Sequence, residues 1–461
     1  MREALITHRT TLLLSMAVAV LVFFLNRNAT SELGIFGGHH IPYARALTGD
    51  FDRSVISYPM WGYPLIIAVF GTGIWLKLLQ LVISFAAFLW IYREWIGDSQ
   101  KTIVRIGVLI LFAWIWFATA SVYWPAAIAI PIWWISVTLH RRLTTIKPST
   151  RTALLTGIAA GIVANFRSDF LLLTLFVFTA ATLAGLINSP KKESLDKIKS
   201  LAIVFAVTLL TLLPWGIYNQ INGEGFRLTS SNGGGVATIS LGQLPGNSWG
   251  ITPRDEFLVR YMESNSNETA SPFDPTSDRL FWELFIDSII DDPTEFAKKM
   301  LWNLKNSLLG GLYVGDIDTF GGVNSSERLD NWKESLKRLA GLNSNPNPES
   351  NSAESSGILS YQLALFVFGV AITAVTALLV IVAIGALILK TKIPASDTSD
   401  ATLAAIVIGV LILIALFQYQ PRHLSTAAPA LIVLALPVIN HWTSRLDNSR
   451  FLQKLRARSV R

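Results

Sequence analysis

Repeated apolar segments are the feature that most restricts what this chain can fold into. Runs of about 17–25 apolar residues recur along the sequence, which is the length that a helix needs to cross roughly 30 Å of hydrocarbon. Of the 461 residues, 51% are hydrophobic and 15% are charged. A soluble domain of ordinary composition carries about a quarter charged residues. The sequence therefore predicts an all-α polytopic membrane protein.

Basic residues lie in short clusters between the apolar segments. The net charge of +7 is compatible with a nucleic-acid partner, but clusters of Lys and Arg between spans are typical of cytoplasmic loops under the positive-inside rule. We therefore expect no nucleic-acid partner. The chain has no cysteine, which excludes disulfides, zinc–thiolate sites and cysteine nucleophiles.

The basic clusters also orient the first part of the chain. We expect residues 10–25 to form a retained first span that runs outward, because no small-residue cleavage site of a signal peptide follows it. Residues 26–64 then form the first exoplasmic loop. Residues 65–70 precede a Gly-Thr-Gly break at 71–73, and counting them as a full span would place the next basic cluster outside. The pattern therefore favours a short or half-inserted helix here, followed by a full span over residues 75–92.

The remaining apolar segments divide the chain into three parts. An N-terminal module, residues 1–215, contains about seven spans, of which the last five are two hairpins and one outward span: residues 106–120 with 124–139, 153–166 with 170–187, and 201–213. Residues 216–357 are rich in Asn, Ser, Gly, Asp and Pro and lack a span, so we expect a mixed exoplasmic domain. Residues 358–461 hold the last spans and a basic cytoplasmic tail, which makes about ten spans in all.

Within the expected exoplasmic domain, one segment has a clear helical pattern. Apolar residues recur at helical spacing over residues 294–308, and Asp291, Asp292 and Pro293 precede them. Acidic side chains and proline are favoured at the start of a helix, so we predict that a helix begins here. The glycines at 233–235 follow no strand-to-helix pattern, and we do not interpret them as a phosphate-binding loop.

The first exoplasmic loop carries a concentrated set of polar residues: His39, His40, Asp50 and Asp52. Each aspartate is a candidate general base or ligand of a divalent cation such as Mg²⁺ or Mn²⁺, although an aspartate at a turn also serves by accepting backbone hydrogen bonds. Each histidine is a candidate base, hydrogen-bond donor to a phosphate, or metal ligand. Because no third ligand lies nearby, we assign no metal site, and a divalent cation is the only cofactor that the pattern leaves open.

Aromatic residues follow at the end of this loop. Tyr58, Trp61 and Tyr63 lie around Pro59 and Pro64. They could form an aromatic lip over a lipid or a sugar. Anchoring of the chain at the membrane interface explains the same residues, so the sequence leaves both interpretations open.

Two arginines lie at the expected outer ends of spans, against the usual charge bias. Arg167 is followed by Ser168 and Asp169, and Arg422 precedes His423 between the last two spans. A guanidinium presents a fork of donors that suits phosphate oxygens, so both arginines are candidate anion-binding residues. For Arg167 the alternatives are a snorkelling side chain or a local pair with Asp169, and His423 could equally be an interfacial residue hydrated by water.

Several stretches are similar to one family of membrane enzymes. They are HHIPYARALTGDF with SYPMWGYPLIIAVFG, GIAAGIVANFRSDFLLL, LLPWGIYNQINGEGFRLTSSNGG, DDPTEFAKKMLWNLKNSL and QPRHLSTAAPAL. In these stretches and in its order of elements, the chain resembles the GT-C fold glycosyltransferases, especially the family 39 branch of protein-O-mannosyltransferases and aminoarabinose transferases. The resemblance covers most of the chain.

The resemblance implies a GT-C helix bundle that transfers a sugar from a polyprenyl-phosphate donor to an exoplasmic glycan, lipid or protein. In that family an acid precedes a loop tyrosine, here Tyr43, by three or four positions, which in this chain are His40 and His39. Either Asp50 or Asp52 takes the role of that acid, or a histidine has replaced it, or the chain is no longer an active transferase of this type. We favour Asp50 or Asp52 as the catalytic base or orienting group, with the two histidines in support. The candidate substrate-binding residues are Tyr43, Tyr58, Tyr63, Arg167, Asp169, Arg422 and His423.

Two other functions are compatible with the sequence. A transporter or lipid flippase typically has two similar halves with paired broken helices, whereas the halves of this chain are unlike. A catalytically inactive GT-C-like scaffold subunit would explain the two histidines at the place of the family's acid. The size and the short loops favour a prokaryotic plasma (inner) membrane, in which lipid surrounds the bundle and the active site lies on the exoplasmic face.

Overall fold

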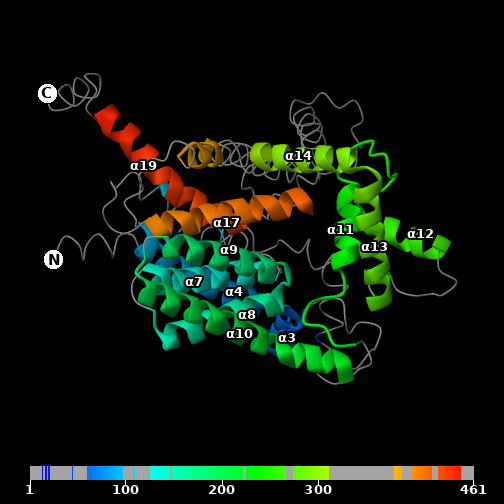
Figure 1. The fold of residues 1–461 in the computed structure, drawn as a ribbon, viewed down its shortest axis with the longest axis horizontal. Coiled ribbons are helices and arrows are strands. Elements are labelled where there is room, and N and C mark those ends of the chain that lie inside the picture. Colours follow the sequence, from blue (N-terminus) through cyan, green and yellow to red (C-terminus); the bar gives the residue numbers. More distant parts are fainter. Residues whose placement is uncertain are drawn as a thin grey trace, which may run out of the picture.

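The fold is described from a computed structural model of the chain. It describes residues 13, 16–17, 19–20, 44, 60–96, 107–108, 116, 120, 125–145, 148–187, 189–221, 225–265, 272, 274–310, 378–386, 397–417 and 424–447. Figure 1 shows how their helices are arranged. Every regular element in these ranges is a helix and none is a strand, in agreement with the all-α prediction for the membrane part.

The first well-described elements are a short helix and a long one. α3 (Gly62–Phe70) is followed by a break at 71–73, and α4 (Ile74–Ile91) continues into one π-helical turn, η2 (Tyr92–Ile96). Gly71 has a φ of 68°, a left-handed conformation that favours glycine, and its N–H donates to a carbonyl oxygen in the last turn of α3. The predicted short helix is confirmed, and the helix after it is long and apolar enough to be the predicted span.

Four further helices form the bundle with α4: α7 (Ala126–Thr145), α8 (Thr150–Phe166), α9 (Asp169–Leu186) and α10 (Lys191–Ile221). In Figure 1 they run roughly parallel, and α8 packs against both α7 and α10. A Cβ on Gly161 of α8 would lie 1.6 Å from Thr211 Oγ1, and one on Gly157 would lie 2.7 Å from the Val204 carbonyl oxygen. Small residues therefore let α8 and α10 approach closely, as is usual between helices in membranes.

Four helices follow the bundle and are termed the α11–α14 unit: α11 (Gly233–Leu241), α12 (Asp255–Asn265), α13 (Pro275–Asp291) and α14 (Pro293–Gly310). Figure 1 shows α11 and α13 lying across the bundle direction, at one end of the bundle. α14 begins where the sequence predicts, and the Glu295 N–H donates to Asp292 Oδ1 at 2.9 Å. Where a mixed domain was expected, the described residues of this region form helices only.

The C-terminal part contributes α17 (Asp397–Leu416), a 3-10 turn η4 (Ser425–Ala427) and α19 (Ala428–Asp447). α17 packs along α9, where a Cβ on Gly409 would lie 2.9 Å from the Phe176 ring. The C-terminal end of α17 packs on α14.

The side of α14 that packs on α17 is polar. Its buried residues recur at helical spacing and are Glu295, Lys299, Asn303, Asn306 and Ser307. Asn303 Nδ2 donates to the Ile414 carbonyl oxygen of α17 at 3.1 Å. Leu301, on the other side, is 67% exposed. The sequence predicts the helix from its spacing. Which side of the helix is buried depends on the carbonyl groups at the end of α17, which bind polar side chains of α14.

Three helices in the described ranges are long and apolar enough to cross a membrane: Ile74–Ile96, Asp169–Leu186 and Lys191–Ile221. Two shorter apolar helices are Ala401–Leu416 and Ser425–His441. These helices support an integral membrane protein, and the total of about ten spans stays a prediction. α10 passes the predicted domain boundary at residue 215 and ends at Ile221.

Candidate functional site

One end of the bundle brings distant polar segments together. It lies where α8 ends and α9 begins and is termed the α8–α9 end. The Trp61 Nε1–H donates to Asn165 Oδ1 at 2.6 Å, and Asn165 Nδ2 donates to the carbonyl oxygens of Gly161 at 2.9 Å and Thr211 at 3.1 Å. A Cβ on Gly62 would lie 2.6 Å from the Asn165 carbonyl oxygen, so glycine permits this approach. The last residues of the predicted first loop, Trp61 and Gly62, are therefore fixed against the end of α8, and Asn165 in turn contacts α10.

The turn between α8 and α9 contains a closed ion pair. Arg167 Nε and Nη2 donate to the two carboxylate oxygens of Asp169 at 3.0 and 2.6 Å. The two side chains are 20% and 47% exposed, and the guanidinium carbon lies 5.8 Å from the centre of the Phe170 ring. The local pair that the sequence left open as an alternative is present. Substrate binding by Arg167 or Asp169 stays a prediction.

The segment after α10 folds back over this turn. Ser230 Oγ lies 3.0 Å from Ser168 Oγ, and Asn219 Nδ2 donates to the Arg227 carbonyl oxygen at 3.1 Å. These contacts hold Arg227 between the α8–α9 end and the α11–α14 unit.

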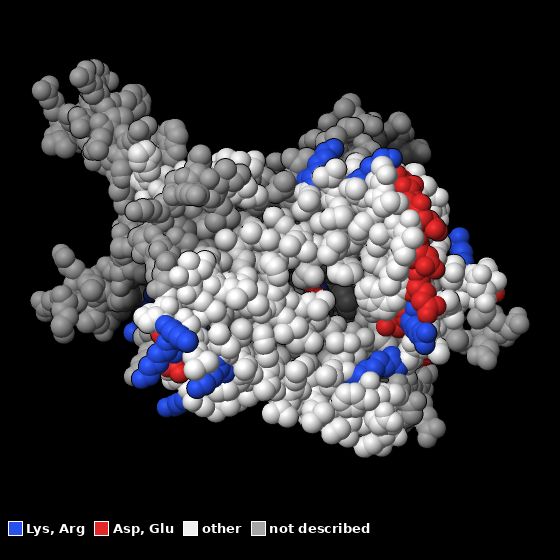
Figure 2. Space-filling model, in the orientation of Figure 1, with Lys and Arg blue, Asp and Glu red and all other residues white. Residues whose placement is uncertain are grey.

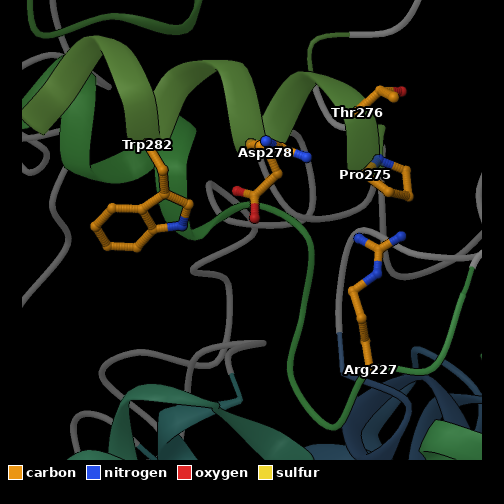
Figure 3. Close-up of a pocket in the computed structure, with 6 residues that line it drawn as sticks. Arg227, Pro275, Thr276, Asp278 and Trp282 are labelled. Carbon is orange, nitrogen blue, oxygen red and sulfur yellow. The ribbon is translucent and has the colours of Figure 1, made fainter.

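A pocket of about 430 Å³ opens beside this segment. Figure 2 shows that the surface is hollowed where the bundle meets the α11–α14 unit. In Figure 3, Asp278 and Trp282 leave α13 toward the same side, and Arg227 reaches toward α13 from the segment below. The pocket has a volume in the range of about 300–1,000 Å³ that is common for small-molecule sites. Its lining residues are Arg227, Pro275, Thr276, Asp278, Arg279 and Trp282.

Asp278 is a partly buried carboxylate held by backbone groups. The Gly234 N–H donates to Asp278 Oδ1 at 2.6 Å. Burial raises the pKa of this carboxyl, while the N–H groups of Gly234 and Gly235 and the charge of Arg227 act in the opposite direction. The carboxylate therefore lies at the first turn of α11, a position that favours acidic side chains.

The glycines at the start of α11 allow this arrangement. A Cβ on Gly234 would lie 2.2 Å from the Asp278 carbonyl oxygen and 2.8 Å from the Trp282 backbone nitrogen. These glycines serve the close packing of α11 on α13. Sequence reasoning did not identify Asp278 or Arg227, because their proximity depends on how α11 packs on α13. The available signal was a run of three glycines directly before a helical segment.

A buried lysine connects the α11–α14 unit with α17. Lys299 Nζ lies within hydrogen-bond distance of four acceptors, which share its three N–H groups: the carbonyl oxygens of Leu416 at 2.7 Å, Ala415 at 3.2 Å and Phe417 at 2.5 Å, and Ser240 Oγ at 3.2 Å. Burial lowers the pKa of its ammonium group to about 7. The last carbonyl groups of a helix have no partners within the helix, so Lys299 caps α17 from a neighbouring helix. Sequence reasoning also missed this residue.

Tyr63 is the one predicted tyrosine in the described ranges, and it faces the bundle interior. It is 1% exposed, and its hydroxyl donates to Gln80 Oε1 at 3.0 Å. Gln80 Nε2 in turn donates to the Ala120 carbonyl oxygen at 2.8 Å. This placement gives Tyr63 a packing role between α3 and α4, and its part in substrate binding stays a prediction.

The other predicted site residues lie outside the described residues: His39, His40, Tyr43, Asp50, Asp52, Tyr58, Arg422 and His423. Their roles stay predictions. Within the ranges that the structure does describe, there is no group of three or more His, Asp or Glu side chains that could hold a metal ion.

No family model matches this chain, and no curated protein matches it. Among solved structures, the chain is similar to the archaeal oligosaccharyltransferase AglB from Archaeoglobus fulgidus, in complex with an inhibitory peptide and a dolichol-phosphate. The sequence identity is 13% and the TM-score is 0.39, over 94% of this chain and 51% of the AglB chain. The chain thus spans about half the length of AglB.

Proposed function

We propose that this chain is a membrane glycosyltransferase of the GT-C type, which moves a sugar from a polyprenyl-phosphate donor to an acceptor at the exoplasmic face. The observation that carries the proposal is that three segments far apart in the sequence meet at the α8–α9 end. They are the last residues of the predicted first loop, the turn at 167–169 and the segment that follows α10. Each belongs to a stretch that resembles the glycosyltransferase family.

The proposed reaction needs a base and a stabilised leaving group. An acceptor hydroxyl oxygen attacks the anomeric carbon of the sugar while the bond from that carbon to the phosphate oxygen breaks. We assign the base that takes the hydroxyl proton to Asp50 or Asp52, with His39 and His40 in support. The polyprenyl phosphate leaves with the bonding electron pair, and cationic groups stabilise it. A divalent cation such as Mg²⁺ or Mn²⁺, if held by the aspartates, would offset phosphate charge.

Arginines are the proposed contacts of the leaving phosphate. Arg422, with His423 beside it, is one candidate, and Arg167 is the other. Arg167 directs its Nε and Nη2 N–H groups to Asp169, so a phosphate would compete with Asp169 for these donors. Tyr43 would contact the substrate from the first loop.

A catalytically inactive scaffold subunit of the same fold is the second candidate. The observation that favours it is the presence of His39 and His40 where the resembled family has an acid. This alternative predicts that the protein binds other envelope components without transferring sugar.

Transfer by the purified protein in lipid nanodiscs tests the proposal. The donors are radiolabelled polyprenyl-phosphate sugars, and the variants are Asp50→Asn and Asp52→Asn, alone and together. Asp287→Asn, at an exposed position of α13, is the matched control. We expect one of the loop variants to lose about 100-fold or more in rate, because acid–base catalysis contributes about 10²–10⁴-fold, and the control to keep its rate. Full activity in both loop variants would remove the assignment, and no transfer by the wild type would favour the scaffold.

A further inference from the structure

The pocket beside Arg227 combines three kinds of side chain. Asp278 supplies hydrogen-bond acceptors, Arg227 and Arg279 supply donors, and Trp282 with Pro275 supplies apolar surface. Figure 3 shows the indole of Trp282 and the carboxylate of Asp278 on one side of α13, with the guanidinium of Arg227 approaching from the facing segment. The proposed transfer chemistry uses none of these residues.

The carboxylate of Asp278 is fixed, and it still has acceptor capacity. The Gly234 N–H binds one of its oxygens at 2.6 Å, and the Gly235 N–H also acts on it. An ionised carboxylate has about four acceptor positions, so two backbone donors leave positions for a ligand. Because backbone N–H groups already hold the Asp278 side chain in place, a ligand would bind at little further cost in side-chain entropy.

The charges around the pocket balance in pairs. Arg227 lies close enough to Asp278 for its charge to lower the pKa of that carboxyl, and Arg279 Nε donates to Glu283 Oε1 at 3.0 Å. Further along α13, Asp287 is exposed, and Figure 2 shows a ridge of acidic side chains on this side of the molecule. Each arginine of the lining thus has a carboxylate near it, Asp278 or Glu283, which weakens the attraction of the pocket for an anion such as phosphate. A neutral ligand with several hydroxyl groups would find both donors and acceptors.

Trp282 supplies a flat apolar surface at the pocket. Its ring packs edge to face with Phe285 at 5.8 Å and with Phe417 at 6.1 Å, so its orientation is fixed, and the side chain is partly exposed. The C–H face of a sugar ring is apolar and packs on an indole, while the hydroxyl groups at the ring edge remain free to bind polar side chains. The three kinds of side chain thus match the surfaces of a sugar ring.

We propose that this pocket binds one sugar unit of a carbohydrate acceptor. The segment that carries Arg227 is tied to the α8–α9 end by the contact of Ser230 with Ser168, so a bound sugar would lie next to the proposed transfer site. That the sugar belongs to the acceptor rests on the proposed function, whereas binding of a sugar in this pocket does not.

Sugar binding by the full-length protein tests this proposal without any need for turnover. The protein is purified in a detergent that lacks a sugar headgroup, and saturation-transfer NMR is recorded with neutral disaccharides of hexoses, N-acetylhexosamines and pentoses. Inorganic pyrophosphate is the anion probe. The variants are Asp278→Asn and Arg227→Gln, and the controls Asp287→Asn and Arg260→Gln replace exposed residues of α13 and α12. If Asp278→Asn fails to fold, Arg227→Gln carries the test, because Arg227 lies on a connecting segment.

We expect at least one disaccharide to give a saturation-transfer signal with the wild type. In both pocket variants this signal should fall about fivefold or more, as for the loss of a hydrogen bond to a charged group. Both control variants should retain it. Equal signals in the variants, no signal from any sugar, or pyrophosphate binding in place of sugar binding would overturn the proposal. Pocket-dependent sugar binding without transfer would support the pocket and contradict the proposed function. Sugar transfer without pocket-dependent sugar binding would support the proposed function and contradict the sugar site in the pocket.

Discussion

Two arginine–aspartate pairs lie near the same end of the bundle, and they are built differently. Arg167 and Asp169 belong to one turn, and the guanidinium makes a bidentate contact with the carboxylate. Arg227 and Asp278 belong to segments far apart in the chain, and the carboxylate is held by the Gly234 N–H. The first pair is closed on itself, whereas the second borders a pocket of about 430 Å³.

The difference follows from how each pair is assembled. In a short turn, opposite charges meet at little further cost in chain entropy, and an exposed pair of this kind contributes little to stability. A pair that is assembled from two segments needs a packed junction, and such a junction can leave room for a ligand. The pocket should therefore depend strongly on helix packing, and the turn should not.

The junction of α11 with α13 gives the largest expected effect. Gly234→Ala would place a Cβ 2.2 Å from the Asp278 carbonyl oxygen, which forces the two helices apart. We expect a loss of about 3 kcal/mol in the free energy of unfolding, the upper part of the usual range for overpacking. Gly233→Ala is the matched control, since its Cβ would meet only the Trp282 side chain, at 3.2 Å. Thermal unfolding in detergent measures both, and equally small effects would contradict a packed junction.

The contact that holds the α11–α14 unit on α17 should come next. Lys299→Met removes the hydrogen bonds of the amino group to the carbonyl oxygens of Ala415, Leu416 and Phe417, of which the last keeps a bond from Asn303. We therefore expect a loss of about 2 kcal/mol in the free energy of unfolding. Lys299→Arg keeps the charge and should therefore lose less stability than Lys299→Met. Lys298→Met, at a side chain that is 63% exposed, is the control. If Lys299→Met unfolds at the same temperature as the control, this lysine does not anchor the unit.

The closed pair in the α8–α9 turn should matter little for folding. Asp169→Asn breaks a half-exposed ion pair, and we expect a change of about 0.5 kcal/mol in the free energy of unfolding. Glu283→Gln, which breaks the exposed pair with Arg279, is the control and should have a similar effect. A loss as large as that of Gly234→Ala would remove the distinction between the two pairs.

The smallest expected effect is a pH dependence at Asp278. Burial raises its pKa above the ordinary value of 3.8, so between the two values the folded state binds more protons than the unfolded state. The stability that this group contributes therefore falls as the pH rises. We expect the stability of the wild type relative to Asp278→Asn to fall as the pH rises above about 4, as measured by thermal unfolding. A stability that rises with pH would show that Gly234 and Arg227 lower the pKa of Asp278 by more than burial raises it.

Features that depend on local pattern could be predicted from the sequence. The glycine break at 71–73 separates α3 from the span α4, and the acidic residue before Pro293 marks the start of α14. In each case neighbouring residues determine the outcome, through backbone freedom at glycine and through capping of free N–H groups.

Features that depend on the choice of a distant partner could not be predicted. The sequence gives α14 a helical pattern, but Lys299 and Asn303 are buried because the end of α17 presents free carbonyl groups to them. Likewise, Asp278 and Arg227 lie near each other only because α11 and α13 pack closely at Gly234. The roles of the residues in the first loop stay predictions, because they lie outside the described residues.

The central claim is that sugar transfer takes place at the α8–α9 end, with the acceptor held in the pocket beside Arg227. The most direct measurement is the dependence of the transfer rate on acceptor concentration, for the wild type and Arg227→Gln in nanodiscs with a polyprenyl-phosphate sugar. We predict that the acceptor KM of Arg227→Gln rises about tenfold while kcat changes little, the pattern for a lost contact that contributes to binding alone. No transfer by the wild type, or a lower kcat at an unchanged acceptor KM, would contradict the claim.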